Sequence, residues 1–488
     1  MFPILSLMIF IPIICGVVVY IIGRYSERGV KIFSLITSLV VFALAIFSYA
    51  MIFINDAGAK MSFVEGPFQW IPTFRGIEYN LGIDGLSGPL LLVTSILTIL
   101  VVLGSRDLIH ERQPLYYALI LFFEGCMIGV FTSLNLILFY VFWELVLIPM
   151  FFFIGIWGGP RRKYAAMKFI LFTYVGSIIM LLGFLALYVF AAPTFNMQAL
   201  SLVNIPFWLQ TLASIATFVG FGIKLPVVPF HTWLPDAHVE APAPISVLLA
   251  GLMLKMGGYG LIRVNLTLFP DASATYGWIF MVIGIFTMFY GAILAIMQKD
   301  LKRMIAFTSV SHMGFVILGA FSGSVFGVSG AIFQMFNHAF AVGLLFMLSG
   351  YIHEQAGTRE IPLLKGLNIT MPKTAILLTL GSIASMGLPV FSNFISEYMV
   401  IVGAVSFDVR LAVAVVVPVI TASYFLFMLK KTLFSSIAEK VVGVHDLSRF
   451  SMINLVIFLV PLLLLLIFPS LVLNLTNPLA ESLVHLVR

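Results

Sequence analysis

Apolar segments of about 20 residues recur along the whole chain, and this feature limits its fold more than any other. A helix needs roughly 20 apolar residues to cross a bilayer, and only helices and closed barrels satisfy their backbone hydrogen bonds there. The composition agrees, since 61% of the 488 residues are hydrophobic and only 9% are charged. Soluble domains carry about a quarter charged residues. The sequence therefore excludes a soluble fold and predicts an all-α polytopic membrane protein.

The apolar pattern predicts about fourteen transmembrane helices. They are expected at residues 2–22, 30–54, 84–104, 114–132, 135–155, 165–191, 207–229, 243–268, 276–297, 302–322, 327–351, 374–404, 409–429 and 452–473. The first is too long for a signal-peptide core and has neither a basic start nor a small-residue cleavage site, so we expect it to be retained. Residues 55–83 are more polar and are expected to form a flap outside the membrane.

The basic residues test this count, because a missed helix would reverse the sidedness of every later loop. If the loop after the first span is cytoplasmic, that side collects nineteen of the 26 lysines and arginines, Lys302 among them. The opposite side holds only Lys60, Arg75, Arg410 and Arg488. We therefore expect a multi-pass protein of the prokaryotic cell membrane, or a comparable energy-transducing membrane, with both termini outside. The cations form no basic stripe interleaved with aromatics, so no nucleic-acid partner is expected.

Proline interrupts two of the expected spans, the seventh at 224–229 and the twelfth at 386–389. Irregular backbone at membrane depth is tolerated only where it is buried in protein or lines a watery cavity. The two breaks lie five spans apart, and this spacing predicts two inverted five-helix repeats with broken helices 7 and 12. The expected units are 1–113 with helices 1–3, 114–268 and 269–430 as the two repeats, and 431–488 with helix 14.

Four ionisable side chains lie where a charge is costly, about 2.5–3.5 kcal/mol at the centre of a membrane helix. Glu144 and Lys255 are central in their spans, Lys224 precedes the first break, and Glu397 follows the second. A structural ion pair would account for Glu144 and Lys224 alone. All four together favour a path for protons, in which a buried lysine changes its protonation state when a neighbouring carboxylate moves away.

Several further residues are candidates for the same path. His312 and His338 lie between the charged residues in the chain and could carry protons. His231 and His238 flank the first break, where they either bind freed backbone groups or take part in proton uptake. The prolines between them disrupt the face that zinc-binding histidine pairs use, so no metal is expected. Glu124 is either a pathway member or a helix-packing contact.

Two other classes of protein are open at this point. His312 and His338 could be axial ligands of a haem, but a haem would leave the buried glutamates and lysines unexplained. A passive assembly subunit would tolerate neutral replacements of the same residues. Cys15 and Cys126 are too few for an iron–sulfur cluster, and we expect no bound cofactor in this chain.

Several long motifs resemble a known family. They are Leu81-Gly-Ile-Asp-Gly-Leu-Ser87, Phe142-Trp-Glu-Leu145, Gly222-Ile-Lys-Leu-Pro226, His231-Thr-Trp-Leu-Pro-Asp-Ala-His238, Lys255-Met-Gly-Gly-Tyr-Gly260, Gln298-Lys-Asp-Leu-Lys-Arg303 and Asn337-His338. Across nearly its whole length the chain resembles the antiporter-like subunits of respiratory complex I, most closely the M type, and their archaeal and photosynthetic relatives. The resemblance implies that Glu144 and Lys224 pair, that Lys255 connects, and that Glu397 is the exit residue. The L and N types carry lysine at that last position.

The resemblance also implies a function. It predicts a proton-translocating membrane-arm subunit of a complex-I-like oxidoreductase, coupled to reduction of a quinone or analogous carrier that binds elsewhere in the complex. The expected partners are other antiporter-like and small membrane subunits and the lipid bilayer, with flavin and iron–sulfur clusters in partner subunits. The alternative is a subunit of a multisubunit cation/proton antiporter. The electron donor stays open between NADH, a reduced deazaflavin and ferredoxin.

Overall fold

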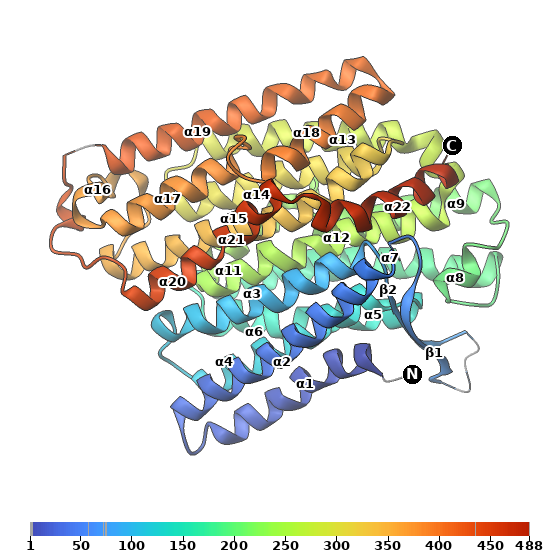
Figure 1. Cartoon of the computed structure of the whole chain (residues 1–488), viewed down its shortest axis with the longest axis horizontal. Coiled ribbons are helices and arrows are strands. Elements are labelled where there is room, and N and C mark those ends of the chain that lie inside the picture. Colours follow the sequence, from blue (N-terminus) through green and yellow to red (C-terminus); the bar gives the residue numbers. More distant parts are fainter. Residues whose placement is uncertain (1–2, 57, 72, 74–75, 435, 488) are drawn as a thin grey trace.

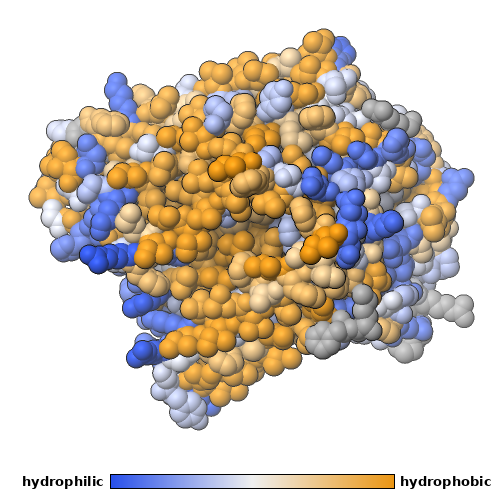
Figure 2. All heavy atoms as spheres, in the orientation of Figure 1, coloured by the Kyte–Doolittle hydropathy of each residue, from blue (hydrophilic) through white to orange (hydrophobic). Residues whose placement is uncertain are grey.

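A computed structural model describes residues 3–56, 58–71, 73, 76–434 and 436–487. Arg75 and Arg488, two of the four basic residues expected on the outer side, lie outside these ranges, as does Phe2 at the start of the first expected span. The described chain is a bundle of long, roughly parallel helices, with α1 at one edge and α19 at the opposite edge (Figure 1). On the face shown in Figure 2, apolar side chains cover the middle of the bundle and hydrophilic ones gather at its two ends. This banding is that of a protein that crosses a bilayer.

The first half of the chain is helical except for one hairpin. Its helices are α1 (Ile4–Ile22), α2 (Glu27–Ile54), α3 (Ser87–Leu108), α4 (Gln113–Thr132), α5 (Leu136–Leu145), α6 (Leu147–Trp157), α7 (Arg162–Phe190), α8 (Met197–Leu200), α9 (Phe207–Lys224), η1 (Phe230–Thr232) and α10 (Trp233–Glu240). Strands β1 (Ser62–Gln69) and β2 (Glu78–Ile83) pair antiparallel. The hairpin forms the flap expected at 55–83. Its Glu65 carboxylate accepts hydrogen bonds from the backbone N–H groups of Leu5 and Ser6 and so caps the start of α1.

The second half begins with one long irregular span. It is made of α11 (Ala243–Leu248), the π-helix η2 (Leu249–Met253), α12 (Leu254–Gly260) and the π-helix η3 (Leu261–Leu266). The following elements are α13 (Pro270–Ile296), α14 (Leu301–Ala320), α15 (Val325–Ala356), η4 (Ile361–Leu363), α16 (Leu367–Thr370), α17 (Pro372–Ser385), α18 (Asn393–Phe407), η5 (Val409–Val415), α19 (Val416–Leu433) and η6 (Glu439–Val441). The last helices are α20 (Arg449–Ile457), α21 (Leu459–Ile467) and α22 (Ser470–Val487).

Twelve helical stretches in the described residues are long and apolar enough to cross a membrane. The expected seventh and twelfth spans are instead broken, with α9 and α10 on either side of the first break and α17 and α18 on either side of the second. The structure thus confirms an all-α multi-pass fold with two broken spans. The exact count of fourteen, the inverted repeats and the four-part division stay predictions.

The C-terminal region differs from the sequence-based expectation. A single span was expected at 452–473 with a short tail, but the helix is interrupted at Phe458 and ends at Ile467. Pro469 follows, and a proline cannot continue a hydrogen-bonded helix. A separate helix, α22, then packs Val472, Leu475 and Leu479 inward. The start of α1 and the end of α22 lie at the same end of the bundle (Figure 1), and the side of the membrane that this end faces stays a prediction.

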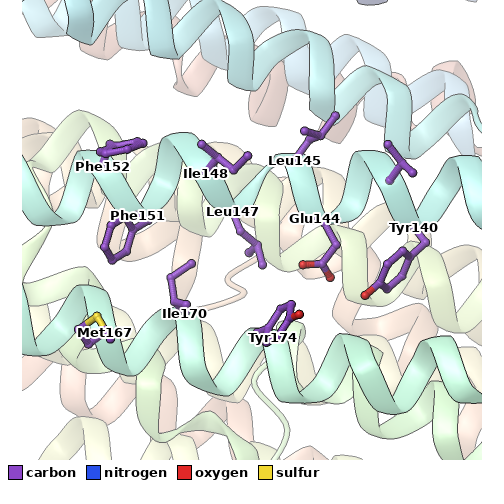
Figure 3. Close-up of a pocket in the computed structure, with 11 residues that line it drawn as sticks. Tyr140, Glu144, Leu145, Leu147, Ile148, Phe151, Phe152, Met167, Ile170 and Tyr174 are labelled. Atoms are coloured by element: carbon purple, nitrogen blue, oxygen red, sulfur yellow. The ribbon is translucent and has the colours of Figure 1, made fainter.

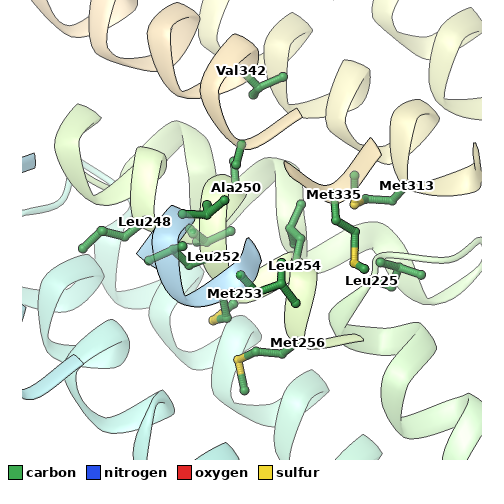
Figure 4. Packing of buried hydrophobic residues seen from close by; sticks show 14 of the residues in the cluster. Leu225, Leu248, Ala250, Leu252, Met253, Leu254, Met256, Met313, Met335 and Val342 are labelled. Carbon is green, nitrogen blue, oxygen red and sulfur yellow. The ribbon is translucent and has the colours of Figure 1, made fainter. Parts of the chain in front are cut away.

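The centre of the bundle is formed by the irregular span 243–266 and by α15, which are buried almost throughout. Around Leu252 and Leu254, side chains from α14 and α15 such as Met313 and Met335 fill the space between the helices (Figure 4). Methionine is flexible and fits irregular gaps. The ionisable groups near the middle of these helices, Lys255 and His338, are therefore held inside protein rather than against lipid.

Candidate functional site

Lys255 lies at the centre of the molecule, on the short helix α12 between the two π-helical segments. Its side chain is fully buried. The ammonium Nζ donates to the Ala250 carbonyl oxygen at 2.5 Å and lies 2.6 Å from Nδ1 of His338. π-Helical turns are rare and frequently occur at functional sites, because they shift side chains out of the regular helical ladder. Sequence analysis placed Lys255 in this span but did not predict the π turns around it.

From Lys255, a series of titratable side chains leads across three helices. His338 on α15 contacts His312 on α14 edge to face, with ring centroids 5.4 Å apart. Nε2 of His312 lies 3.9 Å from Oε1 of Glu397 on α18. All four residues are buried. The structure therefore brings Lys255, His338, His312 and Glu397 together, although they span more than 140 positions of the sequence.

The direct contact between the two histidine rings tests the haem hypothesis. A haem between axial ligands would separate the rings by the thickness of the macrocycle and its two iron–nitrogen bonds. Here one ring edge meets the face of the other, and Nδ1 of His338 is already in contact with the Lys255 ammonium. This arrangement leaves no room for a haem between His312 and His338, and the absence of a bound cofactor in this chain stays a prediction.

Glu397 is held against the break in the twelfth span. Gly387 has a φ of +66°, and a Cβ at this residue would lie 2.3 Å from Oε2 of Glu397. Nε2 of Gln334 donates to Oε1 of Glu397 at 3.5 Å. Within the described residues, the Asn393 amide and the Ser385 hydroxyl beside this break have no hydrogen-bond partner. Buried polar groups of this kind are typical sites of ordered water.

Glu144 and Lys224 lie near each other but are not locked together. Nζ of Lys224 faces the rings of Trp143 and Phe169, at 5.2 and 6.0 Å from their centroids, and has no hydrogen-bond partner in the described chain. Glu144 interacts electrostatically with Lys224 and with the Ser177 hydroxyl. Among the described ion pairs, none within 4.0 Å joins the two residues, so a fixed structural ion pair is not what this structure contains.

Glu144 also borders a cavity of about 650 Å³ between α5, α6 and α7. Figure 3 shows its carboxylate between the Tyr140 and Tyr174 side chains, with Ile148 and Phe152 further along the same wall. Unlike the Lys255 series, this acid is only half-buried. It therefore lies at the edge of the bundle.

Three accessory candidates have no hydrogen bond or ring contact with the central series among the described residues. Glu124 on α4 accepts a hydrogen bond from the Ser38 hydroxyl of α2 at 3.2 Å, which favours its interpretation as a helix-packing contact. The His231 ring contacts Tyr290 edge to face at 5.1 Å. The His238 ring stacks on Phe346 of α15 at 4.4 Å. The two histidines of the first break thus pack against different helices and do not converge.

Sequence analysis missed two buried charged groups. Lys302 was counted among the cations of the basic loops, but it lies buried in the first turn of α14 with its ammonium donating to the Ala241 carbonyl oxygen. Arg263 lies within the expected span 243–268 and was not singled out, and it forms a buried ion pair with Asp84 at 2.6 Å. Both Lys302 and Asp84 lie inside motifs that carried the family resemblance, and that was the only available signal.

Comparison with known proteins gives consistent matches. Residues 133–423 match the family described as NADH:quinone oxidoreductase/Mrp antiporter, transmembrane region. The chain is 36% identical to NADH-quinone oxidoreductase subunit M of Rickettsia prowazekii, over 99% of this chain and 98% of that protein. It is 36% identical to F(420)H(2) dehydrogenase subunit M of Methanosarcina mazei, over 100% and 99% of the two chains. It is 40% identical to NAD(P)H-quinone oxidoreductase chain 4 1 of Synechococcus elongatus, over 89% and 82%.

Solved structures agree with these relatives. A chain of respiratory complex I from Thermus thermophilus superposes with a TM-score of 0.90 and 28% identity, over 99% of this chain and 100% of that one. A chain of the Mrp complex from Dietzia sp. gives a TM-score of 0.87 over 98% and 97%. Its identity of 21% makes this second match evidence for the fold alone.

Proposed function

The chain belongs to the NADH:quinone oxidoreductase/Mrp antiporter family of membrane subunits, and on this premise we propose that it translocates protons in the membrane arm of a complex-I-like oxidoreductase. It is an antiporter-like subunit of the M type. Its part in the enzyme is indirect: electrons pass through other subunits, and this chain moves protons in response.

The observation that carries the proposal is the series of four titratable side chains through the centre of the bundle. Lys255 and His338 are 2.6 Å apart, the two histidine rings are in contact, and His312 lies 3.9 Å from Glu397. Burying such groups costs free energy at every position, and a set of them in mutual contact is typical of a proton relay. A proton on Lys255 passes to His338, then to His312, and leaves through Glu397 beside the second break.

Glu144 and Lys224 form the other half of the proposed mechanism. Because the Lys224 ammonium has no hydrogen-bond partner among the described residues, its charge is stabilised mainly by aromatic rings and by the nearby Glu144 carboxylate. A partner that attracts or displaces Glu144 would therefore change the protonation of Lys224 without first breaking a direct ion pair. This would make the pair a switch at the edge of the bundle.

The partners and cofactors follow from the family. We propose that the chain functions beside other antiporter-like and small membrane subunits, with flavin, iron–sulfur clusters and the quinone-like carrier bound elsewhere in the complex. Relatives of equal identity are named for NADH and for the reduced deazaflavin F420H2. The same type of membrane subunit thus occurs with different electron donors. We also propose that both termini face outward, on the side opposite to the basic loops.

The alternative function, in a multisubunit cation/proton antiporter, has weaker support. The Mrp complex shares the fold at 21% identity, whereas the curated oxidoreductase chains are 36–40% identical over most of their lengths. Purification of the complex in mild detergent separates the two functions. Peripheral flavin and iron–sulfur subunits in the purified complex support the oxidoreductase, and their absence favours the antiporter.

The proton-transfer role is tested at Glu397. In vesicles driven by the native electron donor, Glu397→Gln should strongly reduce proton uptake, while Glu397→Asp should retain part of it. Glu481→Gln, which removes an exposed carboxylate from α22, is the matched control and should pump like the parent. Native gels establish that each complex is assembled. Normal uptake by assembled Glu397→Gln would remove this residue from the path.

A further inference from the structure

A cavity of about 220 Å³ lies at the end of the bundle that carries the basic loops. Its walls come from the α6–α7 turn, the end of α10, the first turn of α14 and the last turns of α15. Glu240, Lys302, His353, Glu354 and Arg359 supply charged or titratable groups to it. The proton series proposed above does not use this cavity, but that series requires an entrance from one side of the membrane.

Lys302 is the buried cation of this cavity. Its side chain is 2% exposed, and its ammonium has a single hydrogen-bond partner in the described chain, the Ala241 carbonyl oxygen at the end of α10. The nearby acid Glu240 is engaged by Arg161, whose Nε lies 3.5 Å from Oε1 and whose backbone N–H donates to Oε2 at 2.9 Å. Arg359 is paired with Asp300 at 3.3 Å. Lys302 is therefore an ammonium without an ion-pair partner among the described residues.

His238 lies directly inward of this cavity. Its ring stacks on Phe346, which is one helical turn before the cavity residues Ser349 and Gly350 on α15. The ring is fully buried, and neither nitrogen has a hydrogen-bond partner among the described residues. Both Lys302 and Lys255 act on it electrostatically. His238 thus stands between the cavity lysine and the central lysine.

We propose that this cavity is the proton entrance of the chain and that Lys302 is the group that loads protons there and passes them through His238 toward Lys255. The inference rests on the proposed function and adds the entry side to it. Through an intervening water, the Lys302 ammonium gives one proton to an unprotonated nitrogen of His238, and the other ring nitrogen releases one proton inward. The neutral Lys302 amine then regains a proton from water in the cavity, so each cycle moves one proton and leaves both groups unchanged.

The geometry along α15 sets the scale of the inward step. The His238 ring stacks on Phe346, and Lys255 contacts His338. Phe346 and His338 are eight residues apart on α15, which is a rise of about 12 Å along the helix axis. This rise separates the two backbone positions and not the rings themselves. No hydrogen bond joins His238 to His338 or Lys255 among the described residues, so a short file of hydrogen-bonded water would have to connect them. The His238 ring, neither of whose nitrogens has a hydrogen-bond partner in the described part of the chain, is suited to begin such a file.

A purely structural role for Lys302 makes a different prediction. A cation at the end of α10 stabilises the last carbonyl groups of the helix, and arginine would do so as well as lysine. A proton-loading group must lose its charge in every cycle, and arginine stays protonated in proteins. Lys302→Arg therefore separates the two roles, and Lys302→His supplies a smaller group that can still titrate.

The test measures proton uptake and electron transfer by the whole complex in vesicles, with assembly checked on native gels. Lys302→Met and Lys302→Arg should each reduce uptake by about tenfold or more, since acid–base groups typically contribute 10²–10⁴-fold, and Lys302→His should recover a measurable part. Lys299→Met is the matched control, because Lys299 is an exposed lysine of the same loop, and it should pump like the parent.

Three results would refute the proposed entrance. The first is pumping at the parental rate by Lys302→Met or Lys302→Arg. The others are a Lys302→His variant that pumps no better than Lys302→Met, and failure of all three variants to assemble. Lys255→Met in the same preparation keeps the two proposals separate. If Lys255→Met also pumps normally, the proposed function itself fails, whereas a loss at Lys255 with normal pumping at Lys302 refutes only the entrance.

Discussion

Replacing Gly387 by alanine is expected to displace the Glu397 carboxylate without removing any ionisable group. An alanine Cβ would lie 2.3 Å from Oε2 of Glu397, whereas ordinary van der Waals contact begins at 3.4 Å. The carboxylate must therefore retreat by about 1.1 Å if the backbone stays in place. Its other contacts, Gln334 at 3.5 Å and His312 at 3.9 Å, would change with it.

The substitution has two energetic effects that a control variant separates. The left-handed backbone of Gly387, at φ +66°, costs an alanine about 1–2 kcal/mol. Gly323 has a nearly identical φ of +60°, and a Cβ added there would meet nothing within 4 Å. Gly323→Ala thus carries the same conformational cost with no displaced carboxylate. Gly387→Ala should lose at least as much thermal stability as Gly323→Ala, and only Gly387→Ala should lose proton transfer.

The assay compares proton uptake with electron transfer in vesicles, for both variants in fully assembled complexes. A misplacement of about 1 Å between reacting groups can reduce a rate by about 10²-fold. Gly387→Ala should therefore pump about ten to a hundred times more slowly than Gly323→Ala. Equal pumping by the two variants would refute the argument that the break positions Glu397 for proton release.

Substitutions at three further positions test other parts of the structure. Lys255→Met removes the titratable amine and Lys255→Arg keeps a permanent charge, so both variants should lose pumping. A normal proton-to-electron ratio in Lys255→Arg would exclude deprotonation of Lys255 as a step. Glu144→Gln should lower turnover of the assembled complex because Lys224 loses the nearby charge that stabilises its ammonium. Glu144→Asp keeps that charge and should have a milder effect. Unchanged pumping by Glu144→Gln would limit the pair to a structural role. Asp84→Ala leaves the Arg263 charge buried and unpaired, which should cost about 3–5 kcal/mol, and thermal unfolding at the parental temperature would contradict this.

The sequence by itself determined the class of the protein and the positions of its anomalies. Apolar length and the cost of burying charge are local properties, so the spans, the two breaks and the ionisable residues Glu144, Lys255 and Glu397 could be identified without coordinates. The residue motifs then indicated the family. Sequence analysis missed the helix α22 because its 18 residues follow Pro469, include Pro478 and are amphipathic, without a strong apolar run.

Only the tertiary structure decided which of these groups meet. His338 and Lys255 are 83 positions apart, and their contact depends on how α15 packs against the π-helical span, which no local pattern encodes. Loop position alone could not reveal that Lys302 is buried, because the first turn of α14 folds under the end of α10. Glu124 and Glu397 look alike in sequence, as single acids in apolar helices, and packing separates them. Glu124 meets a serine where α4 packs against α2, and Glu397 meets a histidine at the centre, where a proton can be passed on.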